Sequence, residues 1–177
     1  DGVNLSISAG STLGVVGESG CGKSTLGRTI LRLIEPTSGE ILYNGQNIAA
    51  YNTRQMLSIR KEMQIIFQDP FSSLNPRMSV RDIIAEPIRV CKLCHSNAEI
   101  NQRVDRLMDT VGLAERFDLS YPHELDGGRR QRIGIARALA VDPEFVVCDE
   151  PVSALDVSIQ AQVLNLLKDL QAEFHLT

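Results

Sequence analysis

Apolar and polar residues alternate over residues 3–7, and this period of two residues predicts a half-buried strand. A second apolar run at 12–16 predicts another strand, which leads into a glycine-rich loop at 17–24. Apolar residues then recur on one helical face. We expect this helix to end near Glu35, because Pro36 disfavours helical backbone in the residue before it.

The remaining chain alternates between strand and helix signals, with a purely helical stretch from Asp69 to about Asp142. The further predicted elements are an antiparallel hairpin at 40–45, a strand at 64–67, helices at 100–111 and 129–140, a strand at 145–148 and a helix at 157–174. This order predicts an α/β fold. Residues 1–69 and 143–177 would form the core, and residues 70–142 would form an inserted helical subdomain.

Composition excludes several classes of protein. The 177 residues are 43% apolar and 23% charged, which is ordinary for a globular protein. Lys and Arg total 18 and Asp and Glu total 22, so the basic excess typical of nucleic-acid binders is missing. No stretch approaches the roughly 20 apolar residues of a membrane span, and nothing at the start resembles a signal peptide. We therefore expect a soluble, cytosolic chain.

The cysteines fit a reducing compartment. Cys91, Cys94 and His95 match the C-x-x-C-H pattern of c-type haem attachment, but that chemistry belongs to exported proteins. Zinc binding is not favoured either, because no second ligand pair follows at a suitable spacing. We interpret Cys91 and Cys94 as two thiols carried by a helix.

Residues 17–24 match the phosphate-binding pattern G-x-x-x-x-G-K-[ST] between a predicted strand and a predicted helix. Glycines let the backbone curl until its N–H groups point inward, and the helix directs its positive N-terminal end at the same point. Such a nest suits a polyphosphate, although a glycine-rich turn without a ligand is the alternative. We predict that Lys23 contacts the β- and γ-phosphates of a nucleotide and that Ser24 binds Mg²⁺. The predicted nucleotide-binding residues are Gly17, Glu18, Ser19, Gly20, Cys21, Gly22, Lys23, Ser24 and Thr25.

Two acidic residues follow the apolar strand predicted at 145–148. An acid at the carboxyl end of a core strand can reach the Mg²⁺ shell, which is the role predicted for Asp149. Glu150 is placed to hold and deprotonate the water that attacks the γ-phosphate. The alternative interpretation is two exposed acids in a loop between strand and helix.

The order of these motifs resembles that of the ATP-binding domain of ABC transporters, over essentially the whole chain. The matching parts are the loop 17–24, Gln68, the segment 125–132 (Leu-Asp-Gly-Gly-Arg-Arg-Gln-Arg), the pair Asp149-Glu150 and the segment 153–156 (Ser-Ala-Leu-Asp). Residues 67–79 resemble the branch that serves oligopeptide and dipeptide importers, which also includes nickel and glutathione uptake systems. The resemblance implies a RecA-like P-loop NTPase core with a short antiparallel β portion and the inserted α-helical subdomain.

The resemblance also implies roles and partners. Two such domains stack head to tail, and each ATP lies between the loop of one subunit and the signature segment of the other. The signature segment would be Leu125, Asp126, Gly127, Gly128 and Arg129, and the coupling loop Ser153, Ala154, Leu155 and Asp156. The implied catalytic residues are Glu150, Gln68 and Lys23, and the implied Mg²⁺ ligands are Ser24, Gln68 and Asp149.

The implied partners are a second ATP-binding subunit, with a distinct chain favoured over an identical one, and transmembrane permease subunits. An extracytoplasmic solute-binding protein would take part indirectly, and no nucleic acid is expected. The helical subdomain would dock on the permeases, and the protein would be peripheral on the cytoplasmic face of the cell membrane.

The sequence departs from the family pattern in two ways. The usual signature is Leu-Ser-Gly-Gly-Gln, whereas this chain has Asp126 and Arg129 in place of the serine and the glutamine. An ionised carboxylate only accepts hydrogen bonds, so we expect Asp126 to cap its own helix with arginine compensation. The adenine-stacking aromatic residue and the catalytic histidine of relatives are also missing, and His95, His123 and His175 are poorly placed. We therefore expect a domain truncated at both ends, with exposed apolar edges and poor hydrolysis in isolation.

Three hypotheses remain open. The first is the ATP-hydrolysing subunit of a solute importer, for oligopeptides or dipeptides. The second is a nucleotide-binding, weakly hydrolytic regulatory partner in a heterodimeric pair, and Asp126 is the residue that separates it from the first. The third is a soluble ABC-type ATPase of DNA repair or translation, which salt-sensitive DNA binding would support.

Overall fold

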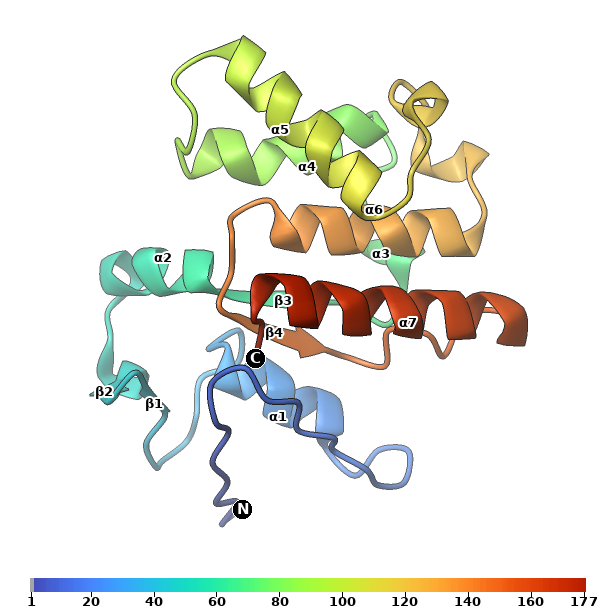
Figure 1. Cartoon of the computed structure of the whole chain (residues 1–177). Helices are drawn as coiled ribbons and strands as arrows, with labels where there is room; N and C mark the ends of the chain where they lie inside the picture. Colours follow the sequence, from blue (N-terminus) through green and yellow to red (C-terminus); the bar gives the residue numbers. More distant parts are fainter. Residues whose placement is uncertain (1) are drawn as a thin grey trace.

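The computed structural model describes residues 2–177. In chain order its helices and strands are α1 (Lys23–Ile30), β1 (Leu42–Tyr43), β2 (Gln46–Asn47), α2 (Thr53–Glu62), β3 (Met63–Ile66), α3 (Pro70–Ser73), α4 (Val80–Val90), α5 (Asn97–Thr110), α6 (Gly127–Leu139), β4 (Phe145–Cys148) and α7 (Val157–Phe174). A central strand pair lies between α1 on one side and α6 on the other, and α4 and α5 cover α6 from outside (Figure 1). Among the described residues, no helix has the length and apolar character needed to cross a bilayer.

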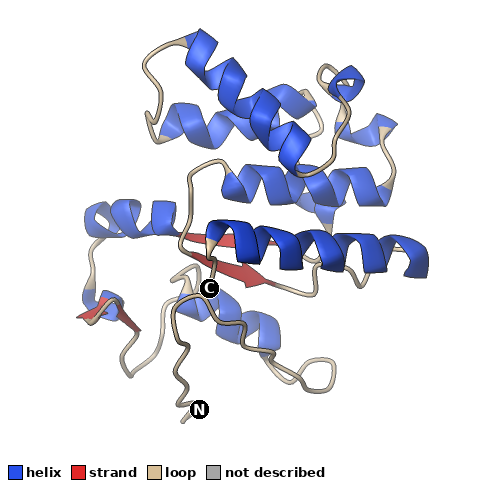
Figure 2. Ribbon diagram, in the orientation of Figure 1, coloured by secondary structure: helices blue, strands red, loops and turns tan. Residues whose placement is uncertain are grey.

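The central pair consists of β3 and β4, which run parallel although almost 80 residues of mostly helical chain separate them (Figure 2). Met63 pairs with Phe145 and Ile66 with Cys148. Parallel strands end at the same edge of a sheet, so the residues after Ile66 and after Cys148 meet there. This register brings Gln68 near Glu150.

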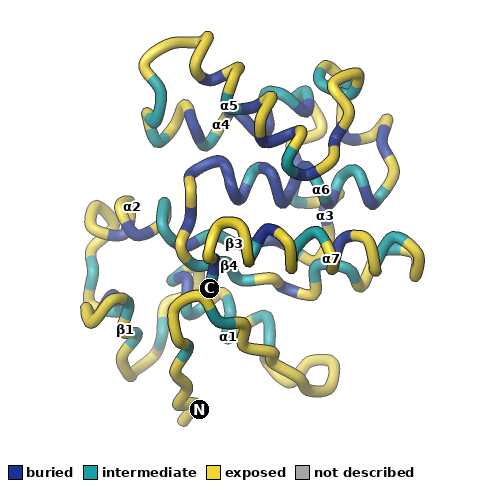
Figure 3. The backbone as a smooth tube through the Cα atoms, viewed as in Figure 1, coloured by how far each residue is buried: buried dark blue, intermediate teal, exposed yellow. Residues whose placement is uncertain are grey.

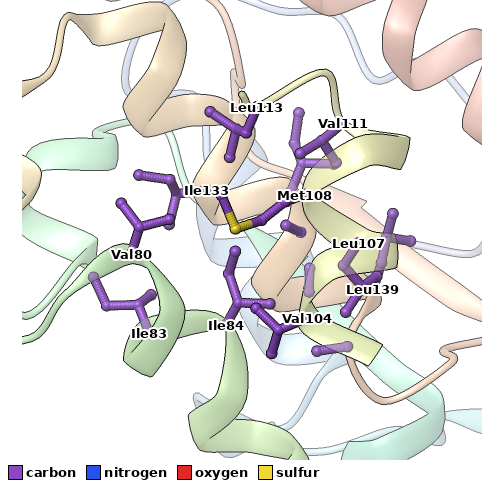
Figure 4. Close-up of a cluster of buried hydrophobic side chains, with 14 of the residues drawn as sticks. Val80, Ile83, Ile84, Val104, Leu107, Met108, Val111, Leu113, Ile133 and Leu139 are labelled. Carbon is purple, nitrogen blue, oxygen red and sulfur yellow. The ribbon is translucent and has the colours of Figure 1, made fainter. Parts of the chain in front are cut away.

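Most of the core surrounds α6. Ile133 and Ile135 of this helix are fully buried, as are Ile84 of α4 and Val104 of α5. Figure 4 shows Ile133 and Met108 surrounded by side chains of α4 and α5. A smaller cluster forms near the hairpin, and Figure 3 shows that burial is concentrated in the helical layer, whereas the N-terminal segment is exposed. The buried side chains of α6 are therefore the centre of the main hydrophobic core.

The predicted hairpin is confirmed as β1 and β2, which pair antiparallel. Asn44 and Gly45 both have positive φ, at 48° and 77°. Two such residues between short strands are the requirement of a tight type I′ turn, which explains why Asn-Gly stands there.

The strands predicted at 3–7 and 12–16 are wrong. Residues 2–16 form no strand, and no backbone hydrogen bond from 12–16 is found among the described residues. The free edge of β4 is instead occupied at one position by Thr177, whose N–H donates to Glu144 O at 3.0 Å and whose O accepts from Val146 N at 2.8 Å. An alternating pattern forms a strand only where a partner edge satisfies its backbone. As expected for unpaired apolar segments, Val16 is 96% exposed.

The helix after the loop is also shorter than predicted, because α1 ends at Ile30 rather than near Glu35. Arg32 has φ 51°. Leu33 N donates to Arg28 O, and Arg32 N donates to Thr29 O. This is a Schellman termination, which usually requires glycine. Arg32 adopts it because its guanidinium donates to two backbone carbonyls, Ile48 O at 2.8 Å and Tyr51 O at 2.6 Å.

The start of α2 is marked by a capping motif that the hydrophobic pattern did not reveal. Asn52 and Gln55 form a reciprocal capping box, with Gln55 N donating to Asn52 Oδ1 at 3.0 Å and Asn52 N donating to Gln55 Oε1 at 2.9 Å. Ser79 caps α4 in a related way by accepting from Asp82 N at 3.2 Å. Polar capping residues thus mark two helices whose starts the apolar periodicity left undefined.

Candidate functional site

The loop at 17–22 and the first turn of α1 leave a group of backbone donors free. Gly20 and Gly22 have φ of 79° and 100°, which L side chains rarely adopt. The N–H groups of Gly22, Lys23, Ser24 and Thr25 find no acceptor among the described residues. Unsatisfied donors at the positive end of a helix are suited to an anion, and four in succession are suited to a polyphosphate.

Lys23 joins this loop to the end of β4. Its Nζ donates to Gly17 O and to Glu18 O, each at 3.0 Å. The same ammonium lies 3.6 Å from Glu150 Oε1. The cation predicted to contact phosphates is therefore at the mouth of the loop, and these contacts orient it there.

Ser24 and Asp149 meet directly, from α1 and from the end of β4. Ser24 Oγ donates to Asp149 Oδ1 at 2.6 Å, and Asp149 N donates to Ile66 O at 2.9 Å, which continues the β3–β4 pairing by one residue. Hydroxyl and carboxylate oxygens are hard ligands of the kind that Mg²⁺ prefers. Mg²⁺ usually takes one or two protein oxygens together with substrate phosphates. The pair therefore fits the predicted metal, and no group of three His, Cys, Asp or Glu side chains suited to a metal was found in residues 2–177.

Glu150 lies beside this pair and is held by its neighbours. Gln68 Nε2 donates to Glu150 Oε2 at 3.0 Å and to Ser153 Oγ at 3.1 Å, and Ser153 Oγ donates to Glu150 O at 3.2 Å. Glu150 has φ 48°, an uncommon conformation for a residue with a side chain. Gln68 thus contacts the predicted base rather than the Ser24–Asp149 pair. Next to it, the backbone N–H of Phe71 donates to Asp69 at 2.8 Å and lowers the pKa of that carboxyl.

The predicted signature segment forms the start of α6. Asp126 Oδ1 accepts from Arg129 N at 2.8 Å, and Asp126 Oδ2 pairs with Arg129 Nη1 at 2.5 Å. The structure therefore shows the helix capping and arginine compensation that the sequence led us to expect. No hydrogen bond or ion pair joins segment 125–129 to residues 17–25 in the part of the chain that the structure covers.

The glycines of this segment have a packing role that the sequence did not reveal. A Cβ on Gly127 would lie 3.0 Å from Leu155 Cδ2, and a Cβ on Gly128 would lie 2.6 Å from Ile159 Cγ2. Both partners belong to the predicted coupling loop or the first turn of α7. Close approach of α6 to this region therefore requires glycine whether or not a nucleotide is present.

The structure also adds one residue, Arg28, that the sequence analysis did not predict. Arg28 Nη2 lies 3.4 Å from Asp149 Oδ2, and its position four residues after Ser24 on one helix face was the available signal. Ala154, Leu155 and Asp156 make no side-chain hydrogen bond to the site residues in the described chain, so Ser153 is the member of the predicted coupling loop that contacts Gln68.

Comparison with known proteins identifies this arrangement. The family described as ABC transporter matches residues 1–153. This chain belongs to the ABC transporter family. The site geometry therefore agrees with the motif order that first indicated the family.

Solved ABC proteins have the same fold. The dimeric structure of a post-hydrolysis state of the ATP-binding cassette MJ0796 bound to ADP and Pi gives a TM-score of 0.86 at 32% identity, covering 97% of this chain and 74% of that one. The structure of cbiO1 from Clostridium perfringens, part of the ABC transporter complex cbiONQ, gives a TM-score of 0.87 at 30% identity, covering 99% and 68%. The predicted fold class, a P-loop NTPase of the ABC type, is confirmed.

Curated relatives include three oligopeptide transport ATP-binding proteins called OppF. The protein of Bacillus subtilis is 59% identical and covers all of this chain, which covers 58% of it. The proteins of Haemophilus influenzae and Escherichia coli are 54% and 51% identical, over 99% and 100% of this chain and 53% of each relative. The chain thus spans a little over half the length of the curated ABC relatives it matches.

Proposed function

We propose that this chain is the ATP-binding part of a subunit that hydrolyses ATP to power an ABC importer for oligopeptides or dipeptides. The importer assignment is supported by the ABC family match and by the names of the OppF relatives. The observation that supports ATP hydrolysis is the convergence of Lys23, Ser24, Asp149 and Glu150 beside the free amides of one loop. We propose the core at 1–69 and 143–177 and the helical subdomain at 70–142 as the corresponding units.

The residues would divide the work as follows. The loop amides and Lys23 bind and neutralise the triphosphate. Ser24 and Asp149 hold Mg²⁺, which when bound supplies positive charge at the β- and γ-phosphates. Glu150 accepts a proton from water, and Gln68 orients Glu150 through its 3.0 Å hydrogen bond. ATP and Mg²⁺ are therefore the proposed ligands of this site.

The proposed partners are supported by the family match and by the dimeric solved relative. A second ATP-binding subunit would complete the site with its own signature segment, and we favour a related but distinct chain. Permease subunits would contact the helical subdomain, and a solute-binding protein would act through them. The protein would then lie at the cytoplasmic face of the membrane as a peripheral subunit.

The test is ATP hydrolysis by the intact protein with its permeases in liposomes, with and without oligopeptides. Glu150→Gln keeps the shape of the side chain but removes its basicity. We expect hydrolysis to fall by about 100-fold or more while ATP remains bound. The control is Glu173→Gln, an exposed change on α7. Undiminished hydrolysis in Glu150→Gln would remove Glu150 from this role, and a rate indifferent to oligopeptides would argue against peptide import.

A second candidate function, a weakly hydrolytic partner in a heterodimer, is favoured by one observation. Asp126 already accepts a hydrogen bond from Arg129 N at the start of α6, and its carboxylate pairs with the Arg129 guanidinium. A phosphate approaching this helix end would meet a carboxylate, and like charges repel. The segment would then support hydrolysis poorly on a partner's ATP.

Asp126→Ser separates the two candidates. Serine caps a helix as well as aspartate, so stability should change by less than about 0.5 kcal/mol. A several-fold gain in the hydrolysis rate of the intact heterodimer would favour the weakly hydrolytic partner. An unchanged or lower rate would favour the fully hydrolytic subunit.

A further inference from the structure

Asp149 is a buried carboxylate that needs a counter-charge. Its side chain is only 5% exposed, and a buried ionised carboxylate is costly unless it is paired and hydrogen-bonded. Ser24 Oγ donates to Oδ1 at 2.6 Å but carries no charge. Lys23 does not fill the gap, because it lies with Glu150 and with the loop carbonyls.

Arg28 supplies the missing charge. Its Nη2 lies 3.4 Å from Asp149 Oδ2, the oxygen that Ser24 leaves free. Arg28 is one helical turn after Ser24, so both side chains project from α1 towards the end of β4. The Arg28 side chain is 45% exposed, which means that it can move into water without disturbing the packed core.

We infer that Arg28 is a positioning residue, which holds Asp149 in place while the site contains no metal. A divalent cation that binds Asp149 displaces Arg28. The inference rests on the proposed function, because it takes Asp149 as a metal ligand. A cation beside Asp149 would lie close to the guanidinium, and the two positive charges repel each other. Binding of Mg²⁺ therefore has to break the Arg28–Asp149 pair. Arg28 in this way raises the Mg²⁺ concentration that the site needs.

The experiment measures Mg²⁺ dependence rather than activity. Calorimetry of ATP binding to the intact protein, repeated at a series of Mg²⁺ concentrations, gives the half-saturating Mg²⁺ concentration. Arg28→Gln keeps a donor but removes the charge, and it should lower that concentration by about fivefold, the size expected for one partly exposed ion pair. Arg28→Lys keeps the charge and should remain close to the unmodified protein. The matched control is Arg54→Gln, the same charge change on the exposed face of α2.

Thermal melting without metal or nucleotide gives the second readout. Loss of the counter-charge should lower the melting temperature of Arg28→Gln by roughly 2–4 °C, whereas Arg28→Lys should melt near the unmodified protein. The melting curves also show that both variants are folded. An unchanged or higher Mg²⁺ requirement in Arg28→Gln, with ATP binding intact, would overturn the inference alone. Failure of the unmodified protein to bind ATP, or binding that ignores Mg²⁺, would overturn the proposed function together with it.

Discussion

Lys23 makes its contacts within the chain before any ligand arrives. Its ammonium bonds to Gly17 O and Glu18 O and lies 3.6 Å from Glu150. A phosphate that binds the loop would take over this cation, since a charge-assisted bond is stronger than a bond to a neutral carbonyl. At the residue scale, the proposed binding of a nucleotide would therefore release Glu150 from Lys23.

Lys23→Ala should reduce ATP affinity by about 100-fold, because a hydrogen bond to a charged group is worth up to about 3 kcal/mol. The fold should change little, since the side chain is partly exposed and its removal leaves no large cavity. Calorimetric titration with ATP checks affinity and circular dichroism checks the fold. Lys92→Ala, an exposed change after α4, is the control. Binding as tight as in the unmodified protein would contradict the role of Lys23.

Much of the site could be predicted at this scale. The loop pattern fixed the places of Lys23 and Ser24, and a strand ending in two acids indicated Asp149 and Glu150. The positions of single contacts were harder to foresee. The hydrogen bond from Arg28 to Asp149 spans 121 residues of sequence, and its only local signal was the position of Arg28 four residues after Ser24.

At the scale of elements, α6 holds its neighbours through its basic side chains. Arg130, Arg132 and Arg137 donate to backbone carbonyls of three surrounding segments, Pro122 O at 2.7 Å, Val111 O at 2.5 Å and Ser73 O at 2.5 Å. Burial lowers the pKa of Arg137. These three arginines thus satisfy backbone carbonyl groups of other segments.

Two glycines of α6 allow a matched prediction. Gly128→Ala should destabilise the protein by about 1–3 kcal/mol, because the new Cβ meets Ile159 Cγ2 at 2.6 Å. Gly134→Ala lies on the same helix with nothing within 4 Å of the new Cβ. It should stabilise by about 1 kcal/mol, since alanine is the better helix former. Urea unfolding of both variants provides the comparison, and equal shifts would refute the packing role of Gly128.

Elements were predictable where the signal is local. Helices α5, α6 and α7, strands β3 and β4 and the β1–β2 hairpin all lie near their predicted positions. The segments at 3–7 and 12–16 failed because a strand needs a partner edge, which is a non-local condition. The position where α1 ends was predicted wrongly, because Arg32 adopts a left-handed conformation that is usual for glycine.

At the scale of the whole molecule, stability depends on the cluster around α6. Ile133 of α6 is fully buried in the core cluster that also contains residues of α4 and α5. Ile133→Ala should cost about 3–4 kcal/mol, the sum of lost burial and the cavity left behind. The midpoint of urea unfolding measures it, with Leu119→Ala, which is 76% exposed, as the control. A shift as small as that of the control would contradict the central place of this cluster.

The contacts of α6 also determine how a movement of residues 153–156 would be transmitted to the rest of the molecule. Its first turn rests on Leu155 and Ile159, and Gln131 Nε2 reaches Phe67 O at 3.5 Å. Arg130 and Arg132 donate to the backbone carbonyls of Pro122 and Val111. These contacts would resist a rotation of α6 relative to its neighbours. A displacement of residues 153–156 would therefore move α6, α4 and α5 together as a rigid body. Few side chains would need to rearrange.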